Sequence, residues 1–291
     1  MITFAINTKN NLNYVKWCVK SIQKNAYYQD FQLLILADEC TDGTNEWLKG
    51  LSLNESRLKY WIHEESNRDL KYFGIGGTLN FLAEKCETEF FLPLHSDMYV
   101  GHHFDYELVK LCKENPKSVI SSHRLEPDVF KNIKGTESFF KLRPGTIVCN
   151  IDLFGHLHNN FKEELFNAYA KQFIVLNDNE YRKAEGAGGF IIRKADWIDN
   201  DPLFAPIWME DMDLWIRMQL KGYKFILTSK SLIWHFAARS SHFPTDDFTK
   251  TSDKQIKSEQ VNQQKWLTKW NKLPSNDNME FVSSKGMYIK H

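Results

Sequence analysis

The sequence lacks a long hydrophobic run, an excess of charge of either sign and any internal repeat, and each absence excludes a class of protein. Lys plus Arg number 37 and Asp plus Glu number 37, so the composition gives no electrostatic argument for a nucleic-acid partner. No stretch approaches the roughly 20 apolar residues of a membrane-spanning helix. The apolar N-terminus is too short, with no basic start, for a signal peptide. We therefore expect a globular protein of the cytoplasm.

Cysteine is also scarce, and its spacing argues against two kinds of site. The chain has five cysteines, an odd number, and no two form a C-x-x-C pair. This pattern argues against a disulfide framework and against a zinc site, and it fits a reducing compartment. The cysteines are Cys18, Cys40, Cys86, Cys112 and Cys149.

What the sequence does have is a regular alternation of apolar strands with amphipathic helices. The strands predicted in the first half are residues 2–7, 31–37, 57–63, 89–94 and 118–122. The helices predicted between them are residues 11–25, 74–86 and 105–114, with one more that Asp42 caps and that ends near Leu51. This β-α-β-α order predicts an α/β fold with a mostly parallel central sheet flanked by helices.

The second half is less regular. Residues 123–185 carry prolines and turn-type clusters, so we interpret them as a mid-chain insertion with one helix, residues 159–172. The elements predicted after it are a glycine-rich strand at 186–193, a helix at 209–221, two strands at 223–227 and 231–235, and a helical tail around 261–270.

Polar residues follow several of the predicted strands, at the point where each strand ends. They are Asn7–Thr8, Asp38 and Ser96–Asp97. In parallel sheets, ligands bind beyond the carboxyl ends of the strands, so these groups are expected to meet at one rim. A carboxylate such as Asp97 can hold a cation on a diphosphate, and hard oxygen ligands suit Mg²⁺ or Mn²⁺. Taken alone, however, a strand that ends in Ser-Asp is more often only a turn.

An acidic segment opens the helix predicted at 209–221. Glu210, Asp211 and Asp213 lie in its first turn, where acidic side chains favour the helix dipole for structural reasons alone. Their mutual repulsion can also raise the pKa of one of them, which is the tuning that a general base needs. His235 ends a short strand 24 residues after Asp211, and a neutral imidazole is a good metal ligand, although a lone histidine is more often structural.

In this order the motifs resemble the family 2 glycosyltransferases, which adopt the GT-A fold. The resemblance spans roughly residues 1–240, and its most specific segment is Glu210-Asp211-x-Asp213-Leu214-x-x-Arg217. The other segments that carry it are Phe4 to Asn10, Leu36 to Thr44, Gly74-x-Gly76-x-Thr78-x-Asn80, Phe91 to Asp97, Gly188 to Arg193, Gly222-Tyr223 and the Lys-Trp pairs at 265–266 and 269–270.

The resemblance implies an inverting transfer of sugar from a nucleotide-sugar donor, assisted by Mn²⁺ or Mg²⁺. Carried over by position, Thr8 and Asp38 would contact the base and ribose, and Asn80 would lie near the diphosphate or behind the metal loop. Ser96 and Asp97 would serve the ribose, the diphosphate and the metal. Asp211 would be the catalytic base, and His235 would bind the metal together with Asp97. The acceptor implied is a glycan or a lipid-linked glycan, in the assembly of a surface glycan or polysaccharide.

Two positions depart from the family pattern. His95 stands where the first aspartate of the D-x-D motif is expected, so the metal site has one carboxylate fewer and its strict metal dependence is open. Ala37 stands where the first acid of the second-strand pair is expected, so recognition of the base falls to Asp38 alone.

We therefore expect a GT-A domain at 1–244, with a nucleotide-binding half at 1–122 and an acceptor and catalytic half at 123–244, and a helical extension at 245–291. The extension joins four lysines to two tryptophans, a composition that could rest on the inner face of a membrane or pack on the domain. These residues are Lys257, Lys265, Lys269, Lys272, Trp266 and Trp270.

Two other functions remain open. A sugar nucleotidyltransferase has a similar sheet but usually carries a glycine-rich basic loop after the first strand, whereas residues 8–12 contain no glycine. A sugar-binding module that lost its chemistry is suggested only by His95, and the intact Glu210-Asp211-x-Asp213 segment argues against it. Release of nucleoside diphosphate from the donor would distinguish an active enzyme from such a module.

Overall fold

The fold is built around one curled α/β sheet. The structure, a computed structural model, describes residues 1–64, 69–129, 145–176, 189–237, 239 and 253–271. Within these residues the sheet has nine strands in the order β3-β2-β1-β4-β8-β6-β9-β5, and β7 pairs with β6. The strands are β1 (Ile2–Thr8), β2 (Phe31–Asp38), β3 (Leu58–His63), β4 (Phe90–His95), β5 (Met98–Val100), β6 (Ser118–Pro127), β7 (Thr146–Cys149), β8 (Phe190–Arg193) and β9 (Lys224–His235).

The first four strands pair in parallel, and the sheet becomes mixed at β8. β1 lies between β2 and β4, and β2 continues to β3, all in parallel. β8 pairs antiparallel with both β4 and β6, and β6 then pairs in parallel with β9. β2 is buried at every position, which explains why a continuous apolar run rather than an alternating one predicted this strand. The predicted α/β class is confirmed.

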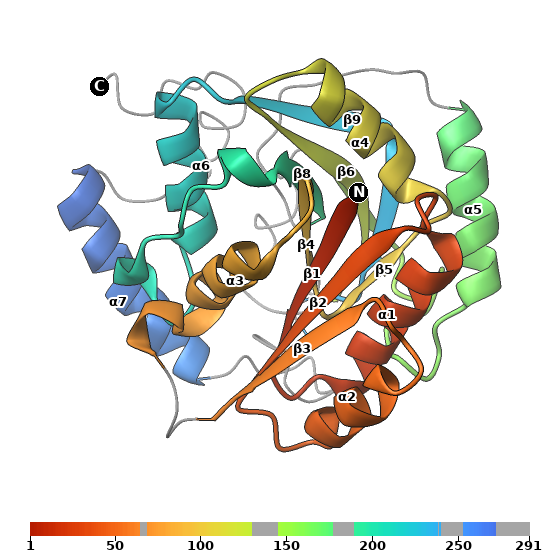
Figure 1. Ribbon diagram of the computed structural model, residues 1–291, viewed down its shortest axis with the longest axis horizontal. Helices are drawn as coiled ribbons and strands as arrows, with labels where there is room; N and C mark the ends of the chain where they lie inside the picture. Colours follow the sequence, from red (N-terminus) through yellow and green to blue (C-terminus); the bar gives the residue numbers. More distant parts are fainter. Residues whose placement is uncertain (65–68, 130–144, 177–188, 238, 240–252, 272–291) are drawn as a thin grey trace.

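Helices cover both faces of the sheet (Figure 1). They are α1 (Leu12–Asn25), α2 (Thr44–Ser52), α3 (Gly74–Lys85), α4 (Phe104–Glu114), α5 (Glu163–Leu176), α6 (Glu210–Leu220) and α7 (Asp253–Trp270). Successive residues of a strand point to opposite faces, so Phe4 packs with α1, α2 and α4 while Ala5 packs with α3, α6 and α7. A third cluster joins α5 to β5 and β9, and its centre is Trp234.

Some predicted boundaries were wrong, and the reasons are physical. The two strands expected at 223–227 and 231–235 form one strand, β9. The register of β9 against β6 shifts at this point: Ser122 lies opposite Thr228, but the next residue, His123, lies opposite Leu232. The residues between, Ser229 to Ser231, are polar and break the apolar pattern. β6 continues to Pro127, five residues beyond the predicted end.

Asp42 supports two helices rather than capping one. The residue directly before α2 is Gly43, and Asp42 Oδ1 accepts hydrogen bonds from the Thr44 backbone N–H (3.2 Å) and hydroxyl (2.6 Å). Its other oxygen accepts from the N–H of Leu12, the first residue of α1, at 2.8 Å. One side chain therefore fixes the starts of α1 and α2 together, near the carboxyl ends of β1 and β2.

The segment from 123 to 185 is only partly an irregular insertion. Its first residues belong to β6, Thr146–Cys149 form β7, and the expected helix is α5, which begins and ends four residues later than predicted. Residues 130–144 and 177–188 lie outside the described residues, as do 245–252 and 272–291 of the predicted extension. In the parts of the chain that are described, no helix combines the length and apolarity needed to cross a bilayer.

Candidate active site

Three side chains, two at strand ends and one in the turn between β4 and β5, form a cluster suited to a metal ion. His95 is the last residue of β4, and the turn at Ser96–Asp97 leads directly into β5. β5 runs antiparallel to β9, with Met98 opposite His235, so the pairing brings Asp97 next to His235. One ligand atom from each of His95, Asp97 and His235 lies within 4.8 Å of the others. The structure thus brings together the two residues that sequence assigned to the metal, and it adds His95.

A buried chain of charged groups orients the His235 ring. Its Nε2 lies 3.2 Å from Asp97 Oδ1, and its Nδ1 lies 2.6 Å from Glu126 Oε1. The same Glu126 oxygen lies 2.8 Å from Arg124 Nε. A carboxylate behind a ligating histidine fixes the tautomer and the direction of the ring. Glu126 is such a residue, and sequence analysis missed it because β6 was expected to end at Ser122.

The charges in this chain compensate one another. Burial raises the pKa of Asp97, but the attraction and hydrogen bond of His235 outweigh it and hold that pKa well below its usual range. Burial lowers the pKa of His235, while Asp97 and Glu126 more than offset this, so its pKa is raised. His235, Asp97 and His95 are the residues that would hold a divalent cation, whose charge would replace that of the imidazolium. The donor set therefore fits a metal ion.

His95 presents a neutral ring to the same cluster. Its imidazole is surrounded by protein although the residue remains accessible at the surface, and the desolvation, with repulsion from His235, lowers the pKa of His95 to about 4. The two imidazole rings lie 5.5 Å apart. A neutral imidazole offers a lone pair to a metal. The histidine at the position of the first D-x-D aspartate could therefore offer a metal a nitrogen ligand where the family pattern has a carboxylate.

The residues assigned to the donor lie on adjacent strand ends. Thr8 ends β1 opposite Ala37, one residue before Asp38 at the end of β2. Ser96 is buried and accepts a hydrogen bond from Asn11 Nδ2 at 2.9 Å, which ties the end of β4 to the start of α1. The Thr8 hydroxyl is buried and has no hydrogen-bond partner within the described residues.

Asn80 lies in α3 and uses its amide within the protein. Its Nδ2 donates to the Asn200 carbonyl at 3.0 Å, and its Oδ1 accepts from the Asn200 backbone N–H at 2.8 Å. This exchange fixes the chain before the short helix at Pro202–Phe204. A role of Asn80 toward the diphosphate stays a prediction, and support of the loops around the site is what its contacts provide.

The acidic segment packs against the start of α3. α3 connects β3 to β4 and so starts at the carboxyl ends of these parallel strands. A Cβ added to Gly76, in the first turn of α3, would lie 3.4 Å from Glu210 Cβ. The first turn of α6 is therefore packed against the start of α3.

The three acids of this segment differ in what surrounds them. Asp213 is fully buried and pairs with Arg217 Nε at 2.7 Å. Glu210 is buried against α3. Asp211 is exposed, and Oδ1 accepts the Met212 N–H at 2.7 Å. Only Asp211 of the three exposes its carboxylate to solvent, as a group that meets a substrate must.

Replacing Glu210 by glutamine is expected to change the pH dependence of stability. Burial, with repulsion from Asp211, raises the pKa of Glu210 to about 8. From about pH 4.5 to 8 the folded state keeps a proton that the unfolded state has lost, so this group makes stability fall as pH rises. Glu210→Gln stays neutral, so its stability relative to the unmodified chain should grow by about 1 kcal/mol per pH unit across that window. Denaturant unfolding at pH 5, 6.5 and 8 measures this difference in stability. Glu89→Gln, a change at an exposed glutamate, is the control. A difference between Glu210→Gln and the unmodified chain that does not vary with pH would contradict the prediction.

Replacing Glu126 by glutamine is expected to weaken metal binding about 10- to 100-fold, because the ring of His235 loses the anion that orients it. Titration with Mn²⁺, followed by calorimetry, measures the affinity. Glu107→Gln is the matched control, since Glu107 is also buried and also has a basic partner, Lys110 at 3.3 Å, but lies in α4. Equal Mn²⁺ affinities in the two variants would show that Glu126 does not support the metal site.

A sequence model of glycosyl transferase family 2 matches residues 3–179, more than half of the chain. No curated protein sequence matches this chain. The solved structure of GalNAc-T7 with UDP, GalNAc and Mn²⁺ aligns with a TM-score of 0.57 and 11% identity over 81% of this chain and 43% of that chain. The mannosyltransferase PcManGT from Pyrobaculum calidifontis, in complex with GDP-Man and Mn²⁺, aligns with a TM-score of 0.56 and 12% identity over 99% of this chain and 72% of that one.

Residues 1–349 of S. aureus TarS align with a TM-score of 0.54 and 14% identity, over 99% of this chain and 71% of that one. The chain spans less than half the length of the GalNAc-T7 chain. At these identities the likeness shows the fold alone, which is the GT-A fold that the sequence predicted. Together with the family match, it confirms the expected fold class and family resemblance.

Proposed function

The chain belongs to glycosyl transferase family 2, and from this premise we propose that it moves a hexose from a nucleoside-diphosphate sugar to an acceptor hydroxyl with inversion at the anomeric carbon. The proposal is supported by two features of the structure: a cluster of three side chains that could hold a cation, and an exposed carboxylate at the start of α6. The cation site is His95, Asp97 and His235, and the carboxylate is Asp211. The cation would stabilise the leaving diphosphate, and the carboxylate would accept the proton of the attacking hydroxyl.

The donor side of the site is assigned to the ends of β1, β2 and β4. Thr8 and Asp38 would contact the base and ribose, and Ser96 and Asp97 would face the ribose and diphosphate. A divalent cation held by Asp97 and the two histidines would offset the negative charge that builds on the leaving diphosphate. Support comes from GalNAc-T7 and PcManGT, whose structures hold UDP and GDP-Man, each with Mn²⁺.

The acceptor side is assigned to Asp211. The acceptor oxygen attacks the anomeric carbon while the bond from that carbon to the diphosphate oxygen breaks. The hydroxyl proton passes to the Asp211 carboxylate, because an alcohol is a poor nucleophile until it loses that proton. The nucleoside diphosphate leaves on the opposite face, so a single displacement inverts the configuration. The position of Asp211 in the first turn of α6, exposed between two buried acids, supports this role.

Manganese is the proposed metal rather than magnesium. Mg²⁺ prefers oxygen ligands in a strict octahedron, whereas two of the three side-chain donors are imidazole nitrogens. Mn²⁺ is a first-row transition metal, and a neutral imidazole is a common ligand for such ions. The histidine at position 95 therefore shifts the preference among metals, and the diphosphate oxygens of the donor would complete the ligand shell.

The acceptor is proposed to be a glycan or lipid-linked glycan in surface glycan or polysaccharide assembly. A peripheral membrane contact through α7 would rest on its exposed Lys257. Trp266 is buried next to Phe204, and Lys269 pairs with Asp201 and Asp213. Co-sedimentation of the chain with anionic liposomes tests this contact, and Lys257→Ala should lower the bound fraction.

The donor assignment is tested by thermal unfolding with a panel of nucleotide-sugars, each with Mn²⁺, with Mg²⁺ and without metal. A ligand that binds the folded state at 100 times its Kd stabilises by about 2.7 kcal/mol, or about 5–10 °C in Tm. We expect one nucleotide-sugar to raise Tm by this amount with Mn²⁺ and by less without it. If no donor raises Tm in the presence of Mn²⁺, the donor assignment is wrong.

A further inference from the structure

The C-terminal helix α7 reaches the segment that leads into Asp211 through one buried amide. Asn262 is 1% exposed. Its Nδ2 donates to the carbonyl oxygens of Phe204 (2.7 Å), Ile207 (2.7 Å) and Trp208 (3.0 Å). An amide nitrogen carries two hydrogens, so three acceptors at these distances share them. A single side chain thus holds three of the five peptide groups at 204–208, directly before α6.

This loop is strained where it enters α6. Trp208 and Met209 have φ values of 82° and 72°, in the left-handed region that side chains rarely adopt. Each such residue costs about 1–2 kcal/mol, and the cost persists only where surrounding contacts impose it. Met209 is the N-cap of α6, and Glu210 and Asp211 follow it. The orientation of the first turn of α6, and so of Asp211, depends on what holds these residues.

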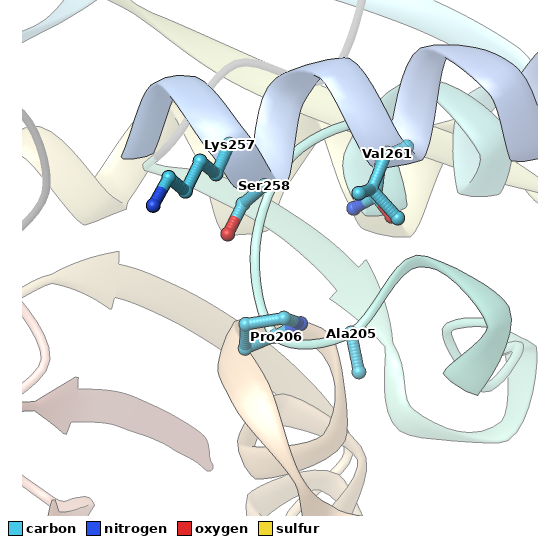
Figure 2. A pocket seen from close by; sticks show the side chains of 6 residues that line it. Ala205, Pro206, Lys257, Ser258 and Val261 are labelled. Carbon is cyan, nitrogen blue, oxygen red and sulfur yellow. The ribbon is translucent and has the colours of Figure 1, made fainter. Parts of the chain in front are cut away.

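Packing between α7 and the first part of the loop is incomplete. A cavity of about 400 Å³ separates them, lined by Ala205, Pro206, Lys257, Ser258, Val261 and Asn262. Figure 2 shows Lys257, Ser258 and Val261 on the helix and Ala205 and Pro206 on the loop across this space. The opposite side of the loop rests on α3, where the Ile75 N–H donates to the Pro206 carbonyl at 2.9 Å. Asn262 therefore supplies a polar connection between α7 and the loop beside this cavity.

The same helix also holds the chain on the other side of Asp211. Lys269 Nζ lies 2.5 Å from Asp213 Oδ1, and Trp270 Nε1 donates to that oxygen at 3.1 Å. Asp213 is fully buried, two residues after Asp211. α7 thus fixes both flanks of the segment that carries the exposed carboxylate.

We propose that Asn262 is a positioning residue for the transfer reaction, and that α7 is part of the catalytic unit rather than an appendage to it. By holding the carbonyls of residues 204, 207 and 208, Asn262 maintains the left-handed entry to α6 and so directs the Asp211 carboxylate toward the acceptor. The inference rests on the proposed role of Asp211. Because a displacement of about 1 Å can cost 10²-fold in rate, loss of these bonds should lower turnover and leave donor binding unchanged.

The test compares four variants of the full chain. Asn262→Ala removes all three bonds, and Asn262→Ser keeps one donor. Gln264→Ala removes an exposed amide from the same helix. Trp266→Phe loosens the buried packing of α7 on Phe204 and keeps the Asn262 side chain. Turnover at saturating donor, donor Kd by calorimetry and hydrogen exchange of a peptide covering 204–213 are measured for each.

We expect Asn262→Ala to lower turnover about 10- to 100-fold, with donor Kd within twofold of the unmodified chain and faster exchange at 204–213. Asn262→Ser should fall between, and Gln264→Ala should behave as the unmodified chain. If Trp266→Phe, at a similar loss of Tm, lowers turnover as much as Asn262→Ala, the role is only structural and the inference is overturned. Normal turnover in Asn262→Ala overturns it equally, as does turnover in Asn262→Ser no higher than in Asn262→Ala. Failure of the proposed function is distinct, because the unmodified chain itself would then show no transfer.

Discussion

Replacing Asp211 by asparagine is expected to lower transfer by about 10²-fold or more while leaving donor binding unchanged. The amide has the shape of the carboxylate but cannot accept the hydroxyl proton at neutral pH. Asp211 is exposed and its one hydrogen bond within the described residues is from the Met212 N–H, so the change should disturb little else. Steady-state rates and donor Kd, measured on the same preparation, check both halves of the expectation.

Asp30→Asn is the matched control for this variant. Asp30 is also exposed, but it precedes β2 and so lies at the amino end of the parallel strands, opposite the proposed site. Its substitution should leave turnover unchanged. Asp213→Asn should instead lower the free energy of unfolding, since Asp213 is buried and holds Arg217, Lys269 and Trp270. Near-normal transfer by Asp211→Asn would remove Asp211 from the role of base.

Removing the metal, or Asp97, is expected to have the second large effect. In the unmodified chain the Asp97 carboxylate accepts the Arg239 backbone N–H at 2.9 Å, and the amide oxygen of Asp97→Asn can still accept it. The substitution removes the one anionic donor among the three side chains of the cluster. We expect Mn²⁺ affinity and the transfer rate to fall by about 10²-fold or more, since a Lewis acid supplies several kcal/mol of charge stabilisation. EDTA should lower the rate of the unmodified chain, and added Mn²⁺ should restore it.

Asp105→Asn separates loss of metal from loss of a buried carboxylate. Asp105 is fully buried and accepts the backbone N–H groups of Tyr27 and Tyr28 at 2.7 and 3.1 Å, on α4 rather than at the metal cluster. This variant should lose stability and keep its Mn²⁺ affinity. Transfer that proceeds unchanged in EDTA would show that the cluster is not a metal site for catalysis, and that His95 and His235 serve the reaction in another way or not at all.

Much of the fold follows from local patterns in the sequence. The buried strands β1, β2 and β4 are short apolar runs, and their order with the helices between them indicates a parallel sheet. That topology alone predicts that Thr8, Asp38 and Asp97 meet at one edge, because each follows the carboxyl end of a strand. The helical start at Glu210 follows from the acidic first turn.

The details of the site depend on contacts that no local pattern encodes. His95 joins Asp97 and His235 in one cluster because β5 turns back to pair with β9, and β5 is too short for its periodicity to stand out. Glu126 lies 109 residues from His235, in a part of β6 beyond the predicted end of the strand. The three acids of α6 look alike in sequence, and burial by α3 and α7 makes them different.

Asn262 shows the same limit most clearly. It lies 54 to 58 residues from the carbonyls that it holds, in a helix whose composition suggested a membrane contact as readily as packing. Strain at Trp208 and Met209 is likewise a tertiary effect, since neither residue favours φ > 0 on its own.

The products formed from a nucleotide-sugar test the central claim most directly. The purified chain is incubated with the donor that raises its Tm, an acceptor glycan, Mn²⁺ and pyrophosphate, and the nucleotides are separated by anion-exchange chromatography. We predict nucleoside diphosphate in amounts equal to the glycan product, suppressed by EDTA and by Asp211→Asn. Nucleoside triphosphate with sugar 1-phosphate would instead identify a nucleotidyltransferase, and unchanged donor would identify a binding module; either result contradicts the account.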